Sequence, residues 1–228
     1  MPRDTLTKEQ IVRTAIELLD EEGLEGLNMR RLGKRLGAAA TTVYWHVKNK
    51  EDLVLLVGDR VWEEIELPDP ASTSWREAAT SMATGLNAMF TRHPWLVQAF
   101  GFYLFYGPGK ARYDDHSLAV YKAGGFVGAR ADRAVAAVFT FVLGNALSTS
   151  AEVSLTRRLS DDGRNARERF QDTMDRAAEV AEGFPRLRTR LQGTAATDYA
   201  AAPDQTFASG LQALLDGLHA QLVEPGQR

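Results

Sequence analysis

The chain of 228 residues contains no cysteine. This absence excludes disulfides, cysteine-based zinc sites and thiol nucleophiles together, and it agrees with a reducing cytoplasm. Long apolar runs are missing as well, because the two most apolar stretches, 95–106 and 134–143, are too short to cross a bilayer as helices. No apolar signal segment follows Met1. The sequence therefore predicts a soluble, cytoplasmic protein with no membrane partner.

Residues that commonly carry catalysis or bind metal do not group along the sequence. The four histidines have neither metal-protease spacing nor paired cysteines, and they stand at His46, His93, His116 and His219. Only His116, beside Asp114 and Asp115, suggests a metal site, and solvated side chains explain this cluster more simply. The segment Gly107–Lys110 resembles part of a phosphate loop but lacks the full motif and a preceding strand. We expect no enzyme activity, no metal and no cofactor.

Acidic residues are absent from one segment of an otherwise acidic chain. The net charge is −3, yet residues 28–50 hold six basic side chains and no Asp or Glu, so the remainder carries −9. The six are Arg30, Arg31, Lys34, Arg35, Lys48 and Lys50. A basic stripe on an acidic body is typical of a DNA-binding domain attached to a domain with another role.

Alternation with period two is also absent, and helical spacing takes its place throughout. Thr7 and Gln10 form a capping box that begins a helix ending at Gly23, Asn28 begins a second that ends at Gly37, and Asn49 begins a fourth. Further helices are expected at 75–92, 95–105, 113–123, 132–152 and 204–222. The predicted fold is all-α, divided at the Pro68–Pro70 break into domains 1–67 and 68–228.

The two short helices within residues 28–47 fit a helix-turn-helix. The second must be slim where it enters the major groove, and Ala39, Ala40, Thr41 and Thr42 are small. We expect Thr41 and Thr42 to read bases. The phosphate contacts are expected from Arg30, Tyr44, His46, Lys48 and Lys50. For Trp45 two roles stay open, a DNA contact or partial burial against the first helix.

Residues 6–57 resemble the DNA-binding domain of the tetracycline-repressor (TetR) family. The resemblance rests on Gly23-Leu24-Glu25-Gly26-Leu27, on Arg30, Leu32 and Leu36-Gly37, and on the string from Thr42 to Lys50, Thr-Val-Tyr-Trp-His-Val-Lys-Asn-Lys. The C-terminal part is similar to the tetracycline repressors in layout, at Gly125-Phe126, 134–144 and 207–222.

This resemblance implies a homodimeric repressor released from DNA by a small molecule. Helices 132–152 and 204–222 would pair with their symmetry mates in a four-helix bundle, and the helix after the DNA-binding motif would swing when the effector binds. The operator would be palindromic, with half-sites roughly 34–36 Å apart.

Two positions depart from the tetracycline repressors. Ala40 and Thr41 stand where those repressors have glutamine and proline, so the operator sequence should differ. Ala99-Phe100-Gly101 stands where they place a metal-coordinating histidine. We therefore do not expect a magnesium–tetracycline complex to be the effector.

Aromatic residues are concentrated in the C-terminal domain, where a largely apolar or aromatic effector is expected. The candidate pocket residues are Leu86, Phe90, Trp95, Phe100, Tyr103, Tyr106, Tyr121 and Phe139. A plain hydrophobic core is the alternative for each of them. For the whole chain, two other functions stay open, an all-α enzyme or ligand carrier and an architectural DNA protein without a ligand.

Overall fold

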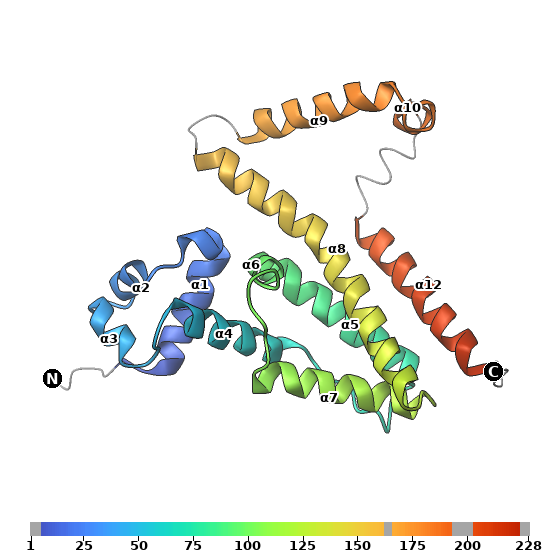
Figure 1. Ribbon diagram of the computed structural model, residues 1–228, viewed down its shortest axis with the longest axis horizontal. Coiled ribbons are helices and arrows are strands. Elements are labelled where there is room, and N and C mark those ends of the chain that lie inside the picture. Colours follow the sequence, from blue (N-terminus) through green and yellow to red (C-terminus); the bar gives the residue numbers. More distant parts are fainter. Residues whose placement is uncertain (1–5, 162–165, 193–202, 224–228) are drawn as a thin grey trace. The chain divides into compact units, whose positions relative to one another are not determined.

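The computed structural model describes residues 6–161, 166–192 and 203–223 (Figure 1). Every regular element within these ranges is a helix, which confirms the predicted all-α fold. The chain packs as two compact units, residues 1–150 and 151–228. The predicted domain boundary at 67/68 falls inside the first unit, in the loop before its fifth α-helix, and stays a prediction.

The first unit contains the helices that form both candidate sites. Its elements are α1 (Lys8–Gly26), α2 (Met29–Arg35), α3 (Ala40–Tyr44), α4 (Lys50–Val61), the 3-10 helix η1 (Trp62–Glu64), α5 (Trp75–Arg92), α6 (Pro94–Ala99), α7 (Pro108–Ala123) and most of α8 (Ala129–Asp161). The second unit contains the end of α8 and, beyond it, α9 (Ala166–Glu182), α10 (Pro185–Gln192) and α12 (Pro203–Val223).

The N-terminal helices begin at the residues that the sequence indicates. Thr7 and Gln10 form the capping box of α1. The side chains of Asn28 and Asn49 accept backbone N–H bonds of 2.9 and 2.7 Å in the first turns of α2 and α4. Gly23, with φ of 72°, interrupts the helix at its predicted end. Local capping chemistry therefore sets these boundaries.

Three predicted helices have clearly different lengths in the structure, and the one expected at 113–123 begins earlier, at Pro108, as α7. The helix expected at 95–105 is the shorter α6, which ends at Ala99, and the chain then turns. This turn lets the rings of Phe100 and Phe105 pack 5.0 Å apart, and Phe105 occupies the space that the absent side chain of Gly58 leaves. The helix expected at 132–152 is longer and runs from 129 to 161 as α8.

A buried histidine links three helical segments of the first unit. His93, between α5 and α6, contacts Asp20 of α1 through Nδ1 (2.7 Å) and Glu64 of η1 through Nε2 (3.1 Å). Trp95 Nε1 donates to the same Asp20 oxygen at 2.8 Å. Burial alone lowers the pKa of His93, but its bonds to the two carboxylates outweigh burial and raise that pKa. His93 therefore connects α1 and η1 to the junction of α5 and α6.

A second link within the first unit is a carboxylate that joins α4 to α7. The two oxygens of Asp59 accept the backbone N–H groups of Gly109 and Lys110 at 3.1 and 3.0 Å, which caps the N-terminus of α7. A side chain at Gly109 would collide with the Asp59 carbonyl oxygen, so glycine permits this close approach. The position of α7 is thereby tied to that of α4.

The part of the chain that the structure describes has neither a membrane-spanning helix nor a metal-binding cluster. None of its helices combines the length and the apolarity needed to span a bilayer. Nor does it contain a group of three or more His, Asp or Glu side chains placed to hold a metal ion.

Candidate DNA-binding surface and effector cavity

Glycines shape the helix-turn-helix. Gly37 adopts a φ of +62° in the turn between α2 and α3, a conformation that side-chain-bearing residues rarely adopt. A Cβ on Gly33 would lie 2.8 Å from the carbonyl oxygen of Ala38 and 3.1 Å from the nitrogen of Ala40. Because both of these atoms belong to the backbone, only glycine lets α2 pack this closely against the start of α3.

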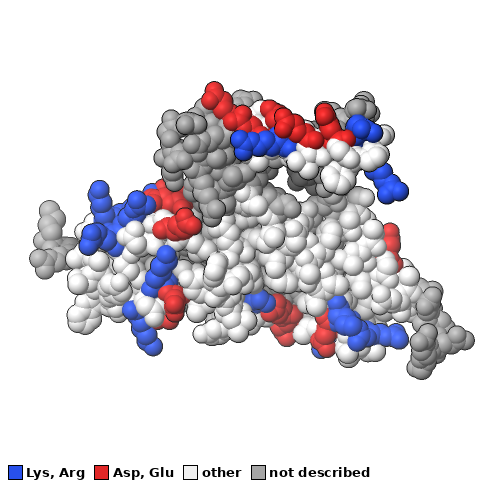
Figure 2. All heavy atoms as spheres, turned by 45° about the horizontal axis from the view of Figure 1, so that its top comes forward, with Lys and Arg blue, Asp and Glu red and all other residues white. Residues whose placement is uncertain are grey.

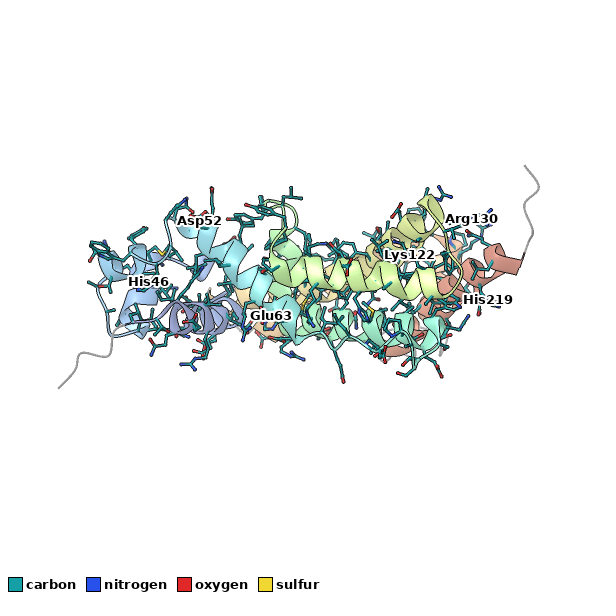
Figure 3. The ribbon with its side chains drawn as sticks, turned by 90° about the horizontal axis from the view of Figure 1, so that it is seen from below. His46, Asp52, Glu63, Lys122, Arg130 and His219 are labelled. Carbon is teal, nitrogen blue, oxygen red and sulfur yellow. The ribbon has the colours of Figure 1, made fainter. Side chains whose placement is uncertain are left out.

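The predicted DNA contacts lie largely on the outside of this motif. Val43 and Val47 are buried and anchor α3 and the turn after it. Trp45 is 87% exposed and Tyr44 50% exposed, so the open question about Trp45 is answered against burial. The other exposed candidates are Arg30, Thr41, His46 and Lys48, while Thr42 and Lys50 are half-buried. Figure 3 shows His46 at this end of the first unit.

Lys50 has a structural partner within the domain. Its ammonium group donates to the backbone carbonyl oxygen of Leu24 at 2.8 Å, which ties the start of α4 to the end of α1. An ammonium group has three donors, so this bond leaves two for a phosphate. Among the predicted contacts, Lys50 therefore supports the fold of the motif as well.

Acidic side chains of α1 pair with part of the basic stripe. Arg31 bonds Glu22, and Arg35 bonds Glu21. The bond from Arg35 lowers the pKa of Glu21, and the bond to Glu21 raises the pKa of Arg35. Basic and acidic side chains accordingly lie side by side at the end of the first unit that carries α1–α3 (Figure 2). These two arginines orient α2 on α1.

A cavity of about 290 Å³ lies in the first unit among α5, α7 and α8. Its volume is at the low end of the range for small-molecule sites. Most of the lining is apolar. The lining residues are Ala79, Met82, Lys110, Tyr113, Asp114, Ser117, Leu118, Tyr121, Asp132, Val135, Ala136, Val138 and Phe139. The cavity can thus enclose a small apolar or aromatic molecule.

Two of the eight predicted pocket residues, Tyr121 and Phe139, line this cavity. Leu86, Phe90 and Trp95 are fully buried in the core, which is the alternative that the sequence left open. Phe100 packs against Phe139 and Trp62 and so supports the wall from behind. Tyr103 stands in the loop after α6 and contacts Phe105. Tyr106 is largely exposed and lines a different hollow, beside His46 and Lys48.

Sequence reasoning missed the charged group of the cavity. Lys110 Nζ lies 2.5 Å from Asp114, and it sits 5.3 and 5.5 Å from the ring centres of Trp62 and Phe139. The segment around Lys110 looked like part of a phosphate loop. The available signal was helical spacing, since 110, 113, 114, 117 and 121 recur on one face of a helix.

Buried phenols add polar atoms to the same cavity. Burial raises the pKa of Tyr113 and of Tyr121 well above the ordinary tyrosine value, so both stay protonated. The Tyr121 hydroxyl is buried without a hydrogen-bond partner among the described residues. An unpartnered buried hydroxyl is costly, and a bound molecule with a suitable acceptor would remove that cost.

Family comparisons agree with this division into two sites. Residues 11–57 match the sequence model described as "Bacterial regulatory proteins, tetR family". Residues 67–222 match the one described as "Tetracyclin repressor-like, C-terminal domain". The first match contains the helix-turn-helix, and the second contains every residue that lines the cavity.

Individual relatives extend the likeness over nearly the whole chain. An HTH-type transcriptional regulator of Saccharopolyspora erythraea is 37% identical over 64% of this chain and 61% of its own length. The HTH-type transcriptional repressor DrrR1 of Streptomyces coeruleorubidus is 30% identical over 98% of this chain and 81% of its own. The TetR family protein ActR of Streptomyces coelicolor, solved in complex with actinorhodin, has a TM-score of 0.75 at 29% identity, covering 97% of this chain and 99% of ActR. This chain belongs to the TetR family of helix-turn-helix transcriptional regulators.

Proposed function

We propose that the protein is a repressor that binds a palindromic operator and is released by a small, largely aromatic effector. The observation that carries this proposal is the pairing of an exposed helix-turn-helix surface with a separate aromatic cavity in one unit. Asp59 joins them, because it lies on the helix that follows the DNA-binding motif and caps the helix that carries Lys110. A molecule that shifts α7 would therefore shift α4.

On the DNA, we assign base contacts to Thr41 and Thr42. Their hydroxyls can bond base edges, and their methyl groups can contact a thymine methyl. Phosphate contacts fall to Arg30, Tyr44, Trp45, His46, Lys48 and Lys50, with Trp45 as a neutral N–H donor. Because the side chains of Ala39 and Ala40 offer no hydrogen bonds, the operator sequence should differ from those that tetracycline repressors read.

TetR-family regulators bind as dimers, and we assign this interface to helices 132–152 and 204–222. On α8, Thr140, Gly144 and Leu147 form an exposed row at helical spacing, which suits the close approach of another helix. We also keep the domain division at 67/68, which agrees with the start of the C-terminal family match. As a DNA-bound regulator, the protein would work in the cytoplasm.

The aromatic nature of the effector is supported by the cavity and by the ActR comparison. Met82, Tyr113 and Phe139 give the cavity flat or adaptable apolar walls. ActR, at 29% identity, was solved with actinorhodin bound. Nothing in the described cavity replaces the metal-coordinating histidine of the tetracycline repressors, so we do not assign a metal to the effector.

The proposal is tested by a gel-shift titration with DNA that flanks the protein's own coding region. The double variant Tyr44→Ala/Lys48→Ala should bind at least about 30-fold more weakly, since it loses two phosphate contacts on each dimer arm. Lys122→Ala is the matched control, because Lys122 is an exposed lysine at the other end of the first unit (Figure 3). Unchanged affinity in the double variant would refute the assigned DNA surface. Turnover or tight ligand binding without any salt-sensitive DNA affinity would favour the enzyme or carrier alternative.

A further inference from the structure

We propose that the cavity selects elongated aromatic anions, with Lys110 binding the negative group at one end and the Tyr121 hydroxyl binding an acceptor at the other. This inference rests on the proposed function, because it names the effector class of the same cavity. It goes further because it requires the ligand to carry a negative charge and, at a set distance from that charge, a hydrogen-bond acceptor.

The length of the ligand follows from the spacing of the two polar residues on α7. Lys110 and Tyr121 both line the cavity, and eleven residues separate them along one continuous helix. At 1.5 Å of rise per residue, their Cα atoms are roughly 16 Å apart along the helix axis. Both side chains reach inward and shorten this span. A ligand that meets both must still be longer than a single aromatic ring.

The charge of the ligand follows from the surroundings of Lys110. Its side chain is 18% exposed, and the ammonium group lies over the rings of Trp62 and Phe139, so Lys110 is largely enclosed by apolar surface. Its partner Asp114 is 45% exposed. Asp114 can turn toward water when another anion arrives, whereas Lys110 stays enclosed.

The second carboxylate of the cavity does not neutralise this site. Asp132, in the first turn of α8, is exposed. Lys110, Asp114 and Asp132 are the charged residues of the lining, and of these the lysine is the most enclosed. A ligand anion would therefore gain most by pairing with Lys110 at the enclosed position, with both aspartates left at the rim.

At the other end, Tyr121 is 4% exposed and its hydroxyl has no partner among the described residues. Because burial raises its pKa, the group remains a phenol and can donate a hydrogen bond. Two enclosed polar side chains of the lining, Lys110 and Tyr121, can both donate, which favours a ligand that supplies acceptors.

Three rigid biphenyls test the contribution of the negative charge independently of the contribution of the distal acceptor. Biphenyl-4,4'-dicarboxylic acid monomethyl ester has a carboxylate at one end and a carbonyl acceptor at the other. Biphenyl-4-carboxylate has the charge alone, and the dimethyl diester has no charge. Their affinities are measured by isothermal titration calorimetry on the full chain, with the wild type and with Lys110→Met, Tyr121→Phe and Asp114→Asn.

The wild type should bind the monoester most tightly. Lys110→Met should weaken both carboxylates by about tenfold or more and leave the diester unchanged, because a charge-assisted bond is lost. Tyr121→Phe should weaken the monoester by about three- to tenfold and leave biphenyl-4-carboxylate unchanged. Asp114→Asn should strengthen both carboxylates, since it removes their competitor for Lys110. Lys122→Met, an exposed lysine of α7 outside the cavity, is the matched control and should change nothing.

Equal binding of all three biphenyls, or carboxylate affinities that Lys110→Met leaves unchanged, would overturn the proposal. So would the absence of binding by any of them. Val135→Trp fills the cavity from α8 and should abolish binding, and binding that survives it would also overturn the assignment. Each of these results leaves the gel-shift test of operator binding unaffected, so this inference can fail while the repressor function stands.

Discussion

The helix-turn-helix and the aromatic cavity place their functional atoms differently in the same unit. Around α3, the groups assigned to DNA are exposed, and the residues that hold the motif together are buried valines and glycines. Around α7, the groups assigned to the effector are half-buried at Lys110 and buried at Tyr121, in contact with aromatic rings of the core.

At the helix-turn-helix, the residues that stabilise the fold differ from those assigned to DNA. At the cavity, the same residues stabilise the fold and line the proposed effector site. A contact side chain such as Trp45 can be removed without touching the packing of α1–α4. Phe139 or Tyr113, in contrast, cannot be changed without disturbing Trp62, against which both rings pack. Variants that test DNA binding should therefore fold normally, whereas most large changes at the cavity should lower stability as well.

The largest expected effect comes from Gly33→Val, which targets packing at the DNA-binding end. The new side chain would push the backbone at Ala38 and Ala40 away, at a cost of about 3 kcal/mol in the free energy of unfolding. We expect operator affinity to fall by about 100-fold in a gel shift. Binding of the biphenyl monoester should persist, and its loss would show that the two sites unfold together.

The next largest effect is expected at the His93 bridge, in which His93 contacts Asp20 of α1 and Glu64 of η1. Replacing His93 by Gln should lower the free energy of unfolding by about 2 kcal/mol, because Asp20 and Glu64 lose a shared charged partner. Arg92, which bonds Glu64, and Trp95, which donates to Asp20, remain in place.

The same bridge predicts a pH dependence. The pKa of His93 is raised in the folded state, so its contribution is complete below its unfolded value of 6.5 and is lost as pH rises through the folded pKa. Urea unfolding at about pH 6 and about pH 9 should show a gap between wild type and His93→Gln that narrows at the higher pH. A gap that widens with pH would contradict a protonated bridge.

A smaller effect is expected at the link between α4 and α7. Asp59→Ala removes the cap that two backbone N–H groups of α7 share, which should lower the free energy of unfolding by about 1 kcal/mol. Operator affinity without effector should change little. The release of DNA by a cavity ligand should weaken, and full release in this variant would show that another contact couples α4 to α7.

The smallest effect on stability is expected at Trp45. Trp45→Ala should leave the midpoint of thermal unfolding within error, because the ring is almost fully exposed. Operator affinity should nevertheless fall by about three- to tenfold, through loss of the N–H donor and of the ring surface. A clear drop in thermal stability would show that Trp45 also serves the fold.

Sequence patterns predicted local features best. The caps at Thr7, Asn28 and Asn49 and the turn at Gly37 were readable because their partners lie within a few residues. The end of α6 was not readable, since it depends on Phe100 and Phe105 meeting Trp62 and Gly58 from distant parts of the chain.

The cavity shows the same limit. A list of aromatic residues could not separate Phe90 and Trp95, which fill the core, from Tyr121 and Phe139, which line a space. Lys110 was missed because its enclosure arises from rings on η1 and α8. For the DNA surface, by contrast, the sequence indicated the exposed residues well, since a short recognition helix leaves most of its polar side chains outside.

The most direct test of the repressor assignment is operator binding at two salt concentrations, with the same DNA and with a scrambled sequence of equal length. We expect tight, sequence-selective binding by the wild type that weakens steeply as salt rises, because phosphate contacts release counterions. Weak binding that does not distinguish the two sequences would contradict a specific repressor and would leave the cavity as the functional centre of the protein.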